Sequence, residues 1–279
     1  MITRVVFNQK GGVGKSSITV NLAAMSAAQG YRTLVIDLDP QSNSSQYILG
    51  SAHDTGQTLP VFSPNIYHFF EEVVGTNQSK GLLGSALGSL LNNKPKGLDA
   101  VMHQSPFSNL AVIPASAELG GLQHALESKH KIYKLRDAIG KLATQFDRIY
   151  IDTPPAFNFF TLSALIAADR VLIPFDCDVF SHRALLTLLD NVIETQQDHN
   201  ENLSVEGVIV NQFQAQAKLP REIVEQLRND ELPVFNTMLP PSVIMKESHL
   251  KNLPLIHLAP EHKLSLTYRQ LFNEIEGIQ

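Results

Sequence analysis

The sequence has little cysteine, no long hydrophobic run and no excess of positive charge, and each absence excludes a class of protein. Cys177 is the one cysteine in 279 residues, which excludes an internal disulfide framework and a Cys-x-x-Cys metal or redox site. The apolar start of the chain becomes polar at Asn8, and nowhere do 18 uncharged apolar residues follow one another, so we expect neither a signal peptide nor a membrane span. The net charge of −5 argues against DNA binding through overall charge. We therefore expect a cytoplasmic protein.

Short apolar runs rich in β-branched residues recur along the chain, and each ends at a polar residue, proline or glycine. Because these runs are continuous rather than alternating, helices are expected to cover both faces of their sheet. Between them, apolar residues recur at spacings of four and three, as in Ile18, Leu22 and Met25, which Gly30 follows as a stop signal. The expected strands are residues 2–7, 33–36, 110–113, 148–151, 171–174, 205–210 and 234–238.

This alternation predicts an α/β fold: a doubly wound, mostly parallel sheet of about seven or eight strands with helices on both faces. Ligands of such sheets bind beyond the carboxyl ends of the strands. No linker divides the chain into two cores, so we expect residues 1–279 to form one domain. Residues 51–97 depart from the pattern, because glycines and polar residues break any long helix there. We interpret them as a variable insertion or surface region with one or two short helices.

A glycine-rich segment, residues 8–17, follows the first expected strand and opens the first expected helix, which is the context that a phosphate-binding loop requires. Its glycines allow tight turns, so that backbone N–H groups, with the helix N-terminus, point toward phosphate oxygens. Lys15 would reach the β- and γ-phosphates, and the Ser16 hydroxyl would bind Mg²⁺. The loop departs from the usual pattern at Gln9, which stands where the first glycine is expected, and it has a second lysine, Lys10. The nucleotide-binding residues that we predict here are Gly11, Gly12, Val13, Gly14, Lys15, Ser16 and Ser17.

Three aspartates follow expected strands and are candidates for magnesium binding and water activation. Asp37 and Asp39 lie two residues apart where a strand ends, a spacing at which both can face the nucleotide. Asp152 ends another strand and precedes two prolines that stiffen the turn. Any one of them alone would be read as an ordinary strand-end aspartate. Three such residues beside a phosphate loop favour a catalytic site.

The motifs at residues 10–17, 37–41 and 151–155 together resemble the ParA/MinD group of deviant Walker ATPases, which are P-loop NTPases, and specifically the ParA/Soj branch. The resemblance implies that two subunits sandwich two ATP molecules, with Lys10 reaching the partner's phosphates beside Lys15. Asp39 would position the attacking water, while Ser16, Asp37 and Asp152 hold Mg²⁺, the two aspartates through its waters. ATP would then switch the protein between a dimer and a monomer.

Weaker matches extend the resemblance over most of the chain, at residues 109–115, 171–174, 207–211 and 239–254. They imply that Asn211 and Pro240 belong to the adenine pocket. For Asn211, a strand-end asparagine in a turn stays open as the alternative.

Features that this sequence lacks argue against membership of the related families in the same superfamily. Iron–sulfur relatives need two cysteines in each chain or a Cys-x-x-Cys, and MinD-type proteins end in a basic amphipathic helix, whereas the last twelve residues here carry two glutamates and one arginine. The expected partners are a second copy of the chain when ATP is bound and a ParB-like or other stimulating protein, with no membrane.

Nonspecific DNA binding, with nucleoid association, is expected to be weak, because five bases and five acids cancel between residues 211 and 251. It would require dimerisation to gather basic residues on one face, namely Lys218, Arg221, Lys246 and Lys251.

We predict a Mg-dependent, ParA-like ATPase whose dimerisation switch partitions or positions DNA or a protein cargo. One alternative is an ATP-dependent ligase of the dethiobiotin-synthetase type, which shares the fold but needs no lysine at position 10. Another is a regulatory module that binds ATP and barely hydrolyses it.

Overall fold

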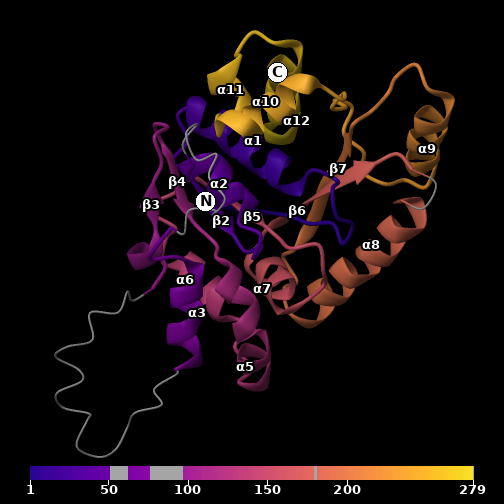
Figure 1. Ribbon diagram of the computed structural model, residues 1–279. Helices are drawn as coiled ribbons and strands as arrows, with labels where there is room; N and C mark the ends of the chain where they lie inside the picture. The colour runs from indigo at the N-terminus through magenta and orange to yellow at the C-terminus, as the bar shows by residue number, and fades with distance from the viewer. Residues whose placement is uncertain (51–61, 76–96, 179–180, 279) are drawn as a thin grey trace, which may run out of the picture.

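The computed structural model describes residues 1–50, 62–75, 97–178 and 181–278, and its centre is one β-sheet (Figure 1). Across the sheet the strands run in the order β3-β4-β2-β5-β1-β6-β7, and every pair is parallel except β3 with β4. The strands are β1 Ile2–Val6, β2 Thr33–Asp37, β3 His103–Gln104, β4 Leu110–Ile113, β5 Arg148–Asp152, β6 Arg170–Asp176 and β7 Ser204–Asn211. The predicted doubly wound, mostly parallel sheet is confirmed.

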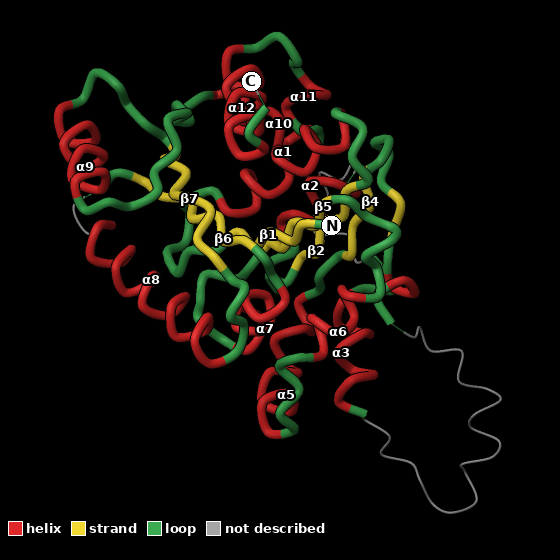
Figure 2. The backbone as a smooth tube through the Cα atoms, turned by 180° about the vertical axis from the view of Figure 1, so that it is seen from behind, coloured by secondary structure: helices red, strands yellow, loops and turns green. Residues whose placement is uncertain are grey.

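Helices cover both faces of this sheet (Figures 1 and 2). On one face lie α1 Lys15–Ala28, α2 Asn43–Leu49, α10 Val243–Lys251, α11 Leu255–Leu258 and α12 Lys263–Glu276. On the other lie α3 Ile66–Val74, α5 Gln123–Ser128, α6 Lys134–Gly140, α7 Phe159–Ala167 and α8 Ser181–Asp198, with α9 Lys218–Asn229 beyond the β7 edge. Short 3₁₀ turns span Asp99–Val101 and Ala117–Leu122. The first helix ends near Gly30, whose φ of 91° suits a stop signal.

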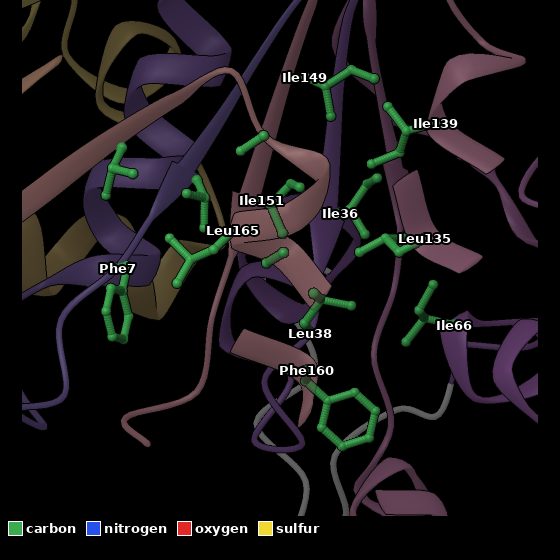
Figure 3. Packing of buried hydrophobic residues seen from close by; sticks show 14 of the residues in the cluster. Phe7, Ile36, Leu38, Ile66, Leu135, Ile139, Ile149, Ile151, Phe160 and Leu165 are labelled. Atoms are coloured by element: carbon green, nitrogen blue, oxygen red, sulfur yellow. The ribbon is translucent and has the colours of Figure 1, made fainter. Parts of the chain in front are cut away.

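The apolar strand residues divide alternately between two cores, one on each face of the sheet. Leu34 and Ile36 of β2 point into the core under α3, α6 and α7, whereas Val35 between them points into the core under α1 and α12. Figure 3 shows part of the first core, in which Leu38, just after β2, lies between Ile151 of β5 and Phe160 of α7. Fully buried side chains of this size contribute about 1.5–3 kcal/mol each. Two buried faces explain why the runs are continuously apolar.

Two predictions about strands need correction. Residues 234–238 do not form a strand: Val234 makes only an isolated bridge to Val208. The Phe235 N–H still donates to the Val208 carbonyl at 3.1 Å. The N–H groups of Asn236 and Thr237 donate instead to the Glu274 carboxylate of α12, at 2.6 and 2.9 Å, so they are not available to a ladder. The second correction is β3, a two-residue antiparallel strand that was not predicted.

The segment 51–97 lies largely outside the described residues, which here include only 62–75 and 97. Within it, α3 is one of the short helices expected there. Its N-cap, Asn65, accepts a hydrogen bond from the Tyr67 N–H at 3.1 Å, and Phe70 buries the inner face of the helix. The extent of a single domain over 1–279 stays a prediction.

Candidate functional site

The phosphate loop lies where β1 and β6 separate at the carboxyl edge of the sheet. Their pairing ends at Val6 and Leu172, while β6 continues beside β7 as far as Asp176. Pro174 falls in this unpaired stretch, where its missing N–H costs no ladder bond to β1, and its carbonyl accepts a hydrogen bond from the Asn8 amide at 2.6 Å. The gap beside β1 is the switch point at which such sheets bind ligands.

Two glycines give the loop its shape. Gly12 and Gly14 have φ values of 78° and 92°, which other residues rarely adopt. A Cβ on Gly14 would lie 2.5 Å from the Asn211 amide nitrogen, and that nitrogen donates to the Val13 carbonyl at 2.9 Å. Asn211 at the end of β7 therefore fixes the loop, a role that the sequence did not reveal. Gln9 has a negative φ, so its position does not require the glycine of the usual pattern.

Lys15 is buried at the start of α1, with 7% of its surface exposed. Its Nζ donates to the Lys10 carbonyl at 3.2 Å, so the side chain folds back over its own loop. Burial lowers the pKa of Lys15, and the carboxylates of Asp152 and Asp39 only partly offset this. Gly14 caps α1 without a side-chain hydrogen bond, and the first N–H groups of a helix capped in this way are suited to bind an anion.

Lys10 points away from this buried centre, toward the end of β6. Its Nζ donates to both oxygens of Asp176, at 2.7 and 2.8 Å, and also to Asp178. The Lys10 side chain is 35% exposed. Desolvation opposes its charge, but the hydrogen bonds to Asp176 and Asp178 outweigh that effect and raise the pKa of Lys10. The two lysines of one loop therefore occupy different environments.

Asp37 and Asp39 follow β2 but have different surroundings. Asp37 is fully buried, and it accepts hydrogen bonds from the Asp39 N–H and from both the N–H and the hydroxyl of Ser45 in α2. Asp39 lines the cavity above the loop and accepts a hydrogen bond from the Gln41 N–H at 2.9 Å. Desolvation raises the pKa of Asp39, although this hydrogen bond and the Lys15 charge oppose the shift. Of the two, Asp39 is the one that lines the cavity.

Asp152 at the end of β5 pairs in register with Asp37 and is fully buried. Its Oδ2 accepts a hydrogen bond from the Ser44 hydroxyl at 2.7 Å, whereas its buried Oδ1 accepts none of normal geometry from the described residues. Desolvation raises the pKa of both Asp37 and Asp152, and the Asp152 charge raises the pKa of Asp37 further. Hydrogen bonds from the Ser16 and Ser44 hydroxyls partly offset the raised pKa of Asp152. A cation beside them would relieve this penalty.

These residues suit Mg²⁺ better than a metal bound by protein alone. Within the described ranges, no three His, Cys, Asp or Glu side chains cluster in a way that could hold a metal. Mg²⁺ in nucleotide sites commonly takes one or two protein oxygens and completes its shell with waters and phosphates. The Ser16 hydroxyl and the orphaned Asp152 Oδ1 supply that kind of donor.

Two cavities meet at the loop. The first, of about 510 Å³, is lined by Gly11, Lys15, Ser16, Asp39 and Pro155, among others. The second, of about 590 Å³, is more apolar and is lined by Asn211, Pro240, Met245, Leu264 and Tyr268, among others. Gly12, Gly14, Ser17 and His249 border both cavities. The fold thus brings the predicted loop residues together with Asn211 and Pro240 around the two cavities. Val13 is buried and its carbonyl bonds Asn211, whereas Lys10 lies beside the cavities. Asp37 and Asp152 are buried below the cavity floor.

Sequence reasoning missed several residues of the site. Asp176 and Asp178, which hold Lys10, lie 166 and 168 positions from it, and His249 lies 232 from its partner Ser17. No local pattern marks such pairings. Asn8, which hydrogen-bonds both the Lys10 N–H and the Pro174 carbonyl, stood inside the loop motif and was the one signal available.

The four basic residues considered for DNA contacts do not form one patch in the single chain. Lys218 and Arg221 lie on α9, and Lys246 and Lys251 lie on α10, which both views show at separate places on the molecule (Figures 1 and 2). Lys218 also pairs with Glu222 at 3.3 Å. None of the described helices combines the length and the apolar character that crossing a membrane requires.

Comparisons with known proteins agree with this geometry. The AAA_31 family, described as an AAA domain, matches residues 1–205. The chain is 31% identical to the chromosome partitioning protein ParA of Myxococcus xanthus, over 97% of this chain and 86% of that protein. It is also 31% identical to the chromosome-partitioning ATPase Soj of Treponema pallidum, over 98% of this chain and 96% of that protein.

Among solved structures, the ATP complex of a Cyanothece McdA variant has the same fold, with a TM-score of 0.78 and 21% identity over 100% of this chain and 97% of that chain. The buried loop lysine, the strand-end aspartates and the nearly full-length ParA and Soj matches lead to one conclusion. The chain belongs to the ParA/MinD family of deviant Walker-type P-loop ATPases, in its ParA/Soj branch.

Proposed function

We propose that this protein is a Mg-dependent ATPase whose ATP-driven dimerisation partitions or positions DNA or a protein cargo. The observation that carries the proposal is the contrast between the two loop lysines. Lys15 is buried over the loop, whereas Lys10 reaches outward to Asp176 and Asp178 on a partly exposed surface. A lysine placed outside its own phosphate site is suited to contact a nucleotide in a second subunit.

In this proposal Lys15 and the N–H groups at the start of α1 hold the phosphates of ATP. Ser16, Asp37 and Asp152 would hold Mg²⁺, which supplies positive charge against the phosphate oxygens when it is bound. Asp39 faces the same cavity and orients the attacking water. Loss of the γ-phosphate removes the contacts of Lys10 from the partner, so the dimer opens.

Two features favour this function over the alternatives. A ligase of the dethiobiotin-synthetase type does not need Lys10, yet here the residue keeps a hydrogen-bonded place beside the loop. A module that only binds nucleotide does not need a carboxylate such as Asp39 in the lining of the phosphate cavity. The ParA and Soj relatives, matched over nearly the whole chain, support a role in partitioning, with a ParB-like protein as the stimulating partner.

The test is ATP titration with size-exclusion chromatography and phosphate release, with and without candidate partners and DNA. Lys15→Ala should abolish nucleotide binding, whereas Lys10→Ala should still bind ATP but stay monomeric. Asp39→Ala should dimerise with ATP and release phosphate on the order of 100-fold more slowly, which is typical for loss of a base that activates water. A Lys10→Ala variant whose phosphate release equals that of the wild type would support the ligase alternative. A wild-type protein that binds ATP without phosphate release under any condition would support the regulatory module.

A further inference from the structure

His249 lies on α10, and its side chain contacts Ser17 at the end of the phosphate-loop motif. Its Nε2 is 2.9 Å from the Ser17 hydroxyl, and its ring packs edge-on against Tyr47 with centroids 4.9 Å apart. The adjacent Ser248 is buried, hydrogen-bonds the Tyr47 hydroxyl and donates to the Leu253 carbonyl. Tyr47 in turn accepts a hydrogen bond from Asn21 of α1 at 3.1 Å. The position of His249 is thus fixed by contacts among α1, α2 and α10.

The ring of His249 stands at the junction of the two cavities. Of the four residues that border both, Gly12 and Gly14 offer only backbone, so Ser17 and His249 are the two with polar side chains. A nucleoside polyphosphate that places its terminal phosphates in the first cavity and its base in the second must pass this junction. Its phosphate nearest the nucleoside then lies beside Ser17 and His249.

We propose that His249 is a nucleotide-contacting residue, which donates a hydrogen bond from Nε2 to the phosphate nearest the nucleoside in exchange for its bond to Ser17. This inference rests on the proposed function, because it names a ligand atom for the same site. An imidazole is a donor in its neutral and its charged forms, and the charged form adds attraction to an anion.

Charge around the ring favours an exchange that depends on pH. The charged groups lining the same cavities are Lys15 and Asp39 near the loop and Lys246 on α10, with the hydroxyls of Tyr47 and Tyr268 as the other titratable groups. Partial burial lowers the pKa of His249 from its ordinary value of 6.5, so the free protein holds it neutral at pH 7. An adjacent phosphate raises this pKa, and ADP affinity then increases as the pH falls.

The experiment measures ADP dissociation constants by calorimetry at pH 6, 7 and 8 for the full-length protein, His249→Gln and His257→Gln. His257 is the matched control, because burial also lowers its pKa but it stacks on Phe107, at 4.4 Å between centroids, and is not among the residues lining the two cavities. His249→Gln should weaken ADP binding about tenfold at pH 6, as expected for a lost charge-assisted hydrogen bond, and by less at pH 8. His257→Gln should behave like the wild type.

A second measurement keeps the test decisive if His249→Gln perturbs the fold. In wild-type protein with ¹³C-labelled histidine, the imidazole resonance of His249 should move on adding ADP, and its titration midpoint should rise. An unmoved resonance, or equal ADP affinities of wild type and His249→Gln at every pH, would overturn the inference while leaving the proposed function intact. Absence of ADP binding by the wild type would instead count against the proposed function.

Discussion

The two ends of the central sheet both contain buried charges, but only one end balances them. At the amino end, Arg4 of β1 is 2% exposed and donates to both oxygens of Glu206 on β7, at 2.7 and 2.9 Å, and to Glu276 on α12 at 2.6 Å. Arg148 of β5 completes the group with a 2.6 Å bond to the same Glu276. Two arginines face two glutamates, so this end is electrically complete.

The carboxyl end has the opposite character. Asp37 and Asp152 lie side by side on neighbouring strands, both fully buried, and desolvation raises the pKa of both. The Lys15 charge only partly offsets the raised pKa of Asp152, and burial lowers the pKa of Lys15 itself. Buried charges that are fully paired belong to the architecture, whereas buried charges that lack a counterion are arranged for a ligand.

The largest effect is expected at the balanced end. Arg4→Met should lower the free energy of unfolding by about 3–5 kcal/mol, because it leaves the partly buried Glu206 without its arginine and removes one of the two arginines that bond Glu276. Urea denaturation of the wild type and the variant measures this. Nucleotide affinity should stay unchanged under conditions where the variant is folded.

The matched control for Arg4 is Arg32→Met. Arg32 also pairs with a carboxylate, Asp147, at 2.7 Å, but its side chain is 53% exposed, so little change is expected. Similar losses for the two variants would contradict the distinction between balanced and exposed pairs.

An intermediate effect is expected from removing one charge at the unbalanced end. Because the folded-state pKa of Asp37 and of Asp152 is raised above the ordinary 3.8, the folded protein holds more protons than the unfolded one above that value. Stability of the metal-free protein should therefore fall as the pH rises from about 4 toward 8. Asp152→Asn should flatten this dependence and be more stable at pH 8 by on the order of 1–3 kcal/mol.

Thermal or urea unfolding at several pH values measures the difference between wild type and Asp152→Asn. Adding Mg²⁺ with ADP should stabilise the wild type more than the variant. If the variant were less stable than the wild type at pH 8 without metal, Asp152 would be a balanced charge, and the comparison of the two ends would fail.

The smallest effect on stability is expected at the partly exposed group around Lys10. Asp178→Asn should change the free energy of unfolding by less than about 1 kcal/mol, because solvent screens this group. It should nevertheless lower the ATP concentration needed for dimerisation a few-fold, since Lys10 then has one ion pair fewer to break within its own subunit before it can contact the partner. Light scattering during ATP titration measures this, with Lys10→Ala as the control that removes dimerisation altogether. An unchanged or raised ATP requirement would mean that the Lys10 pairings do not compete with the dimer.

Predictions from sequence succeeded where the signal is local. Residues 10–17 carry in one stretch the glycines, the lysine and the helix start that shape the loop, and Gly12 and Gly14 adopt the positive φ that their type permits. The apolar runs of β1, β2 and β5 identified the central strands, because strands buried on both faces need little context to be recognised. The prediction for 234–238 was wrong, because Glu274, from a helix near the chain end, takes the N–H groups of Asn236 and Thr237.

The chain by itself determined the phosphate loop, the order of the central strands and the family, since these depend on neighbouring residues and on which side chains avoid water. Only the tertiary structure decided which charges are balanced. Arg4 and Glu276 are 272 positions apart, and Lys10 and Asp176 are 166 apart. The physical reason is that a charge is stabilised by whatever lies within a few ångströms in space, and the folding of the sheet, not the spacing along the chain, sets those neighbours.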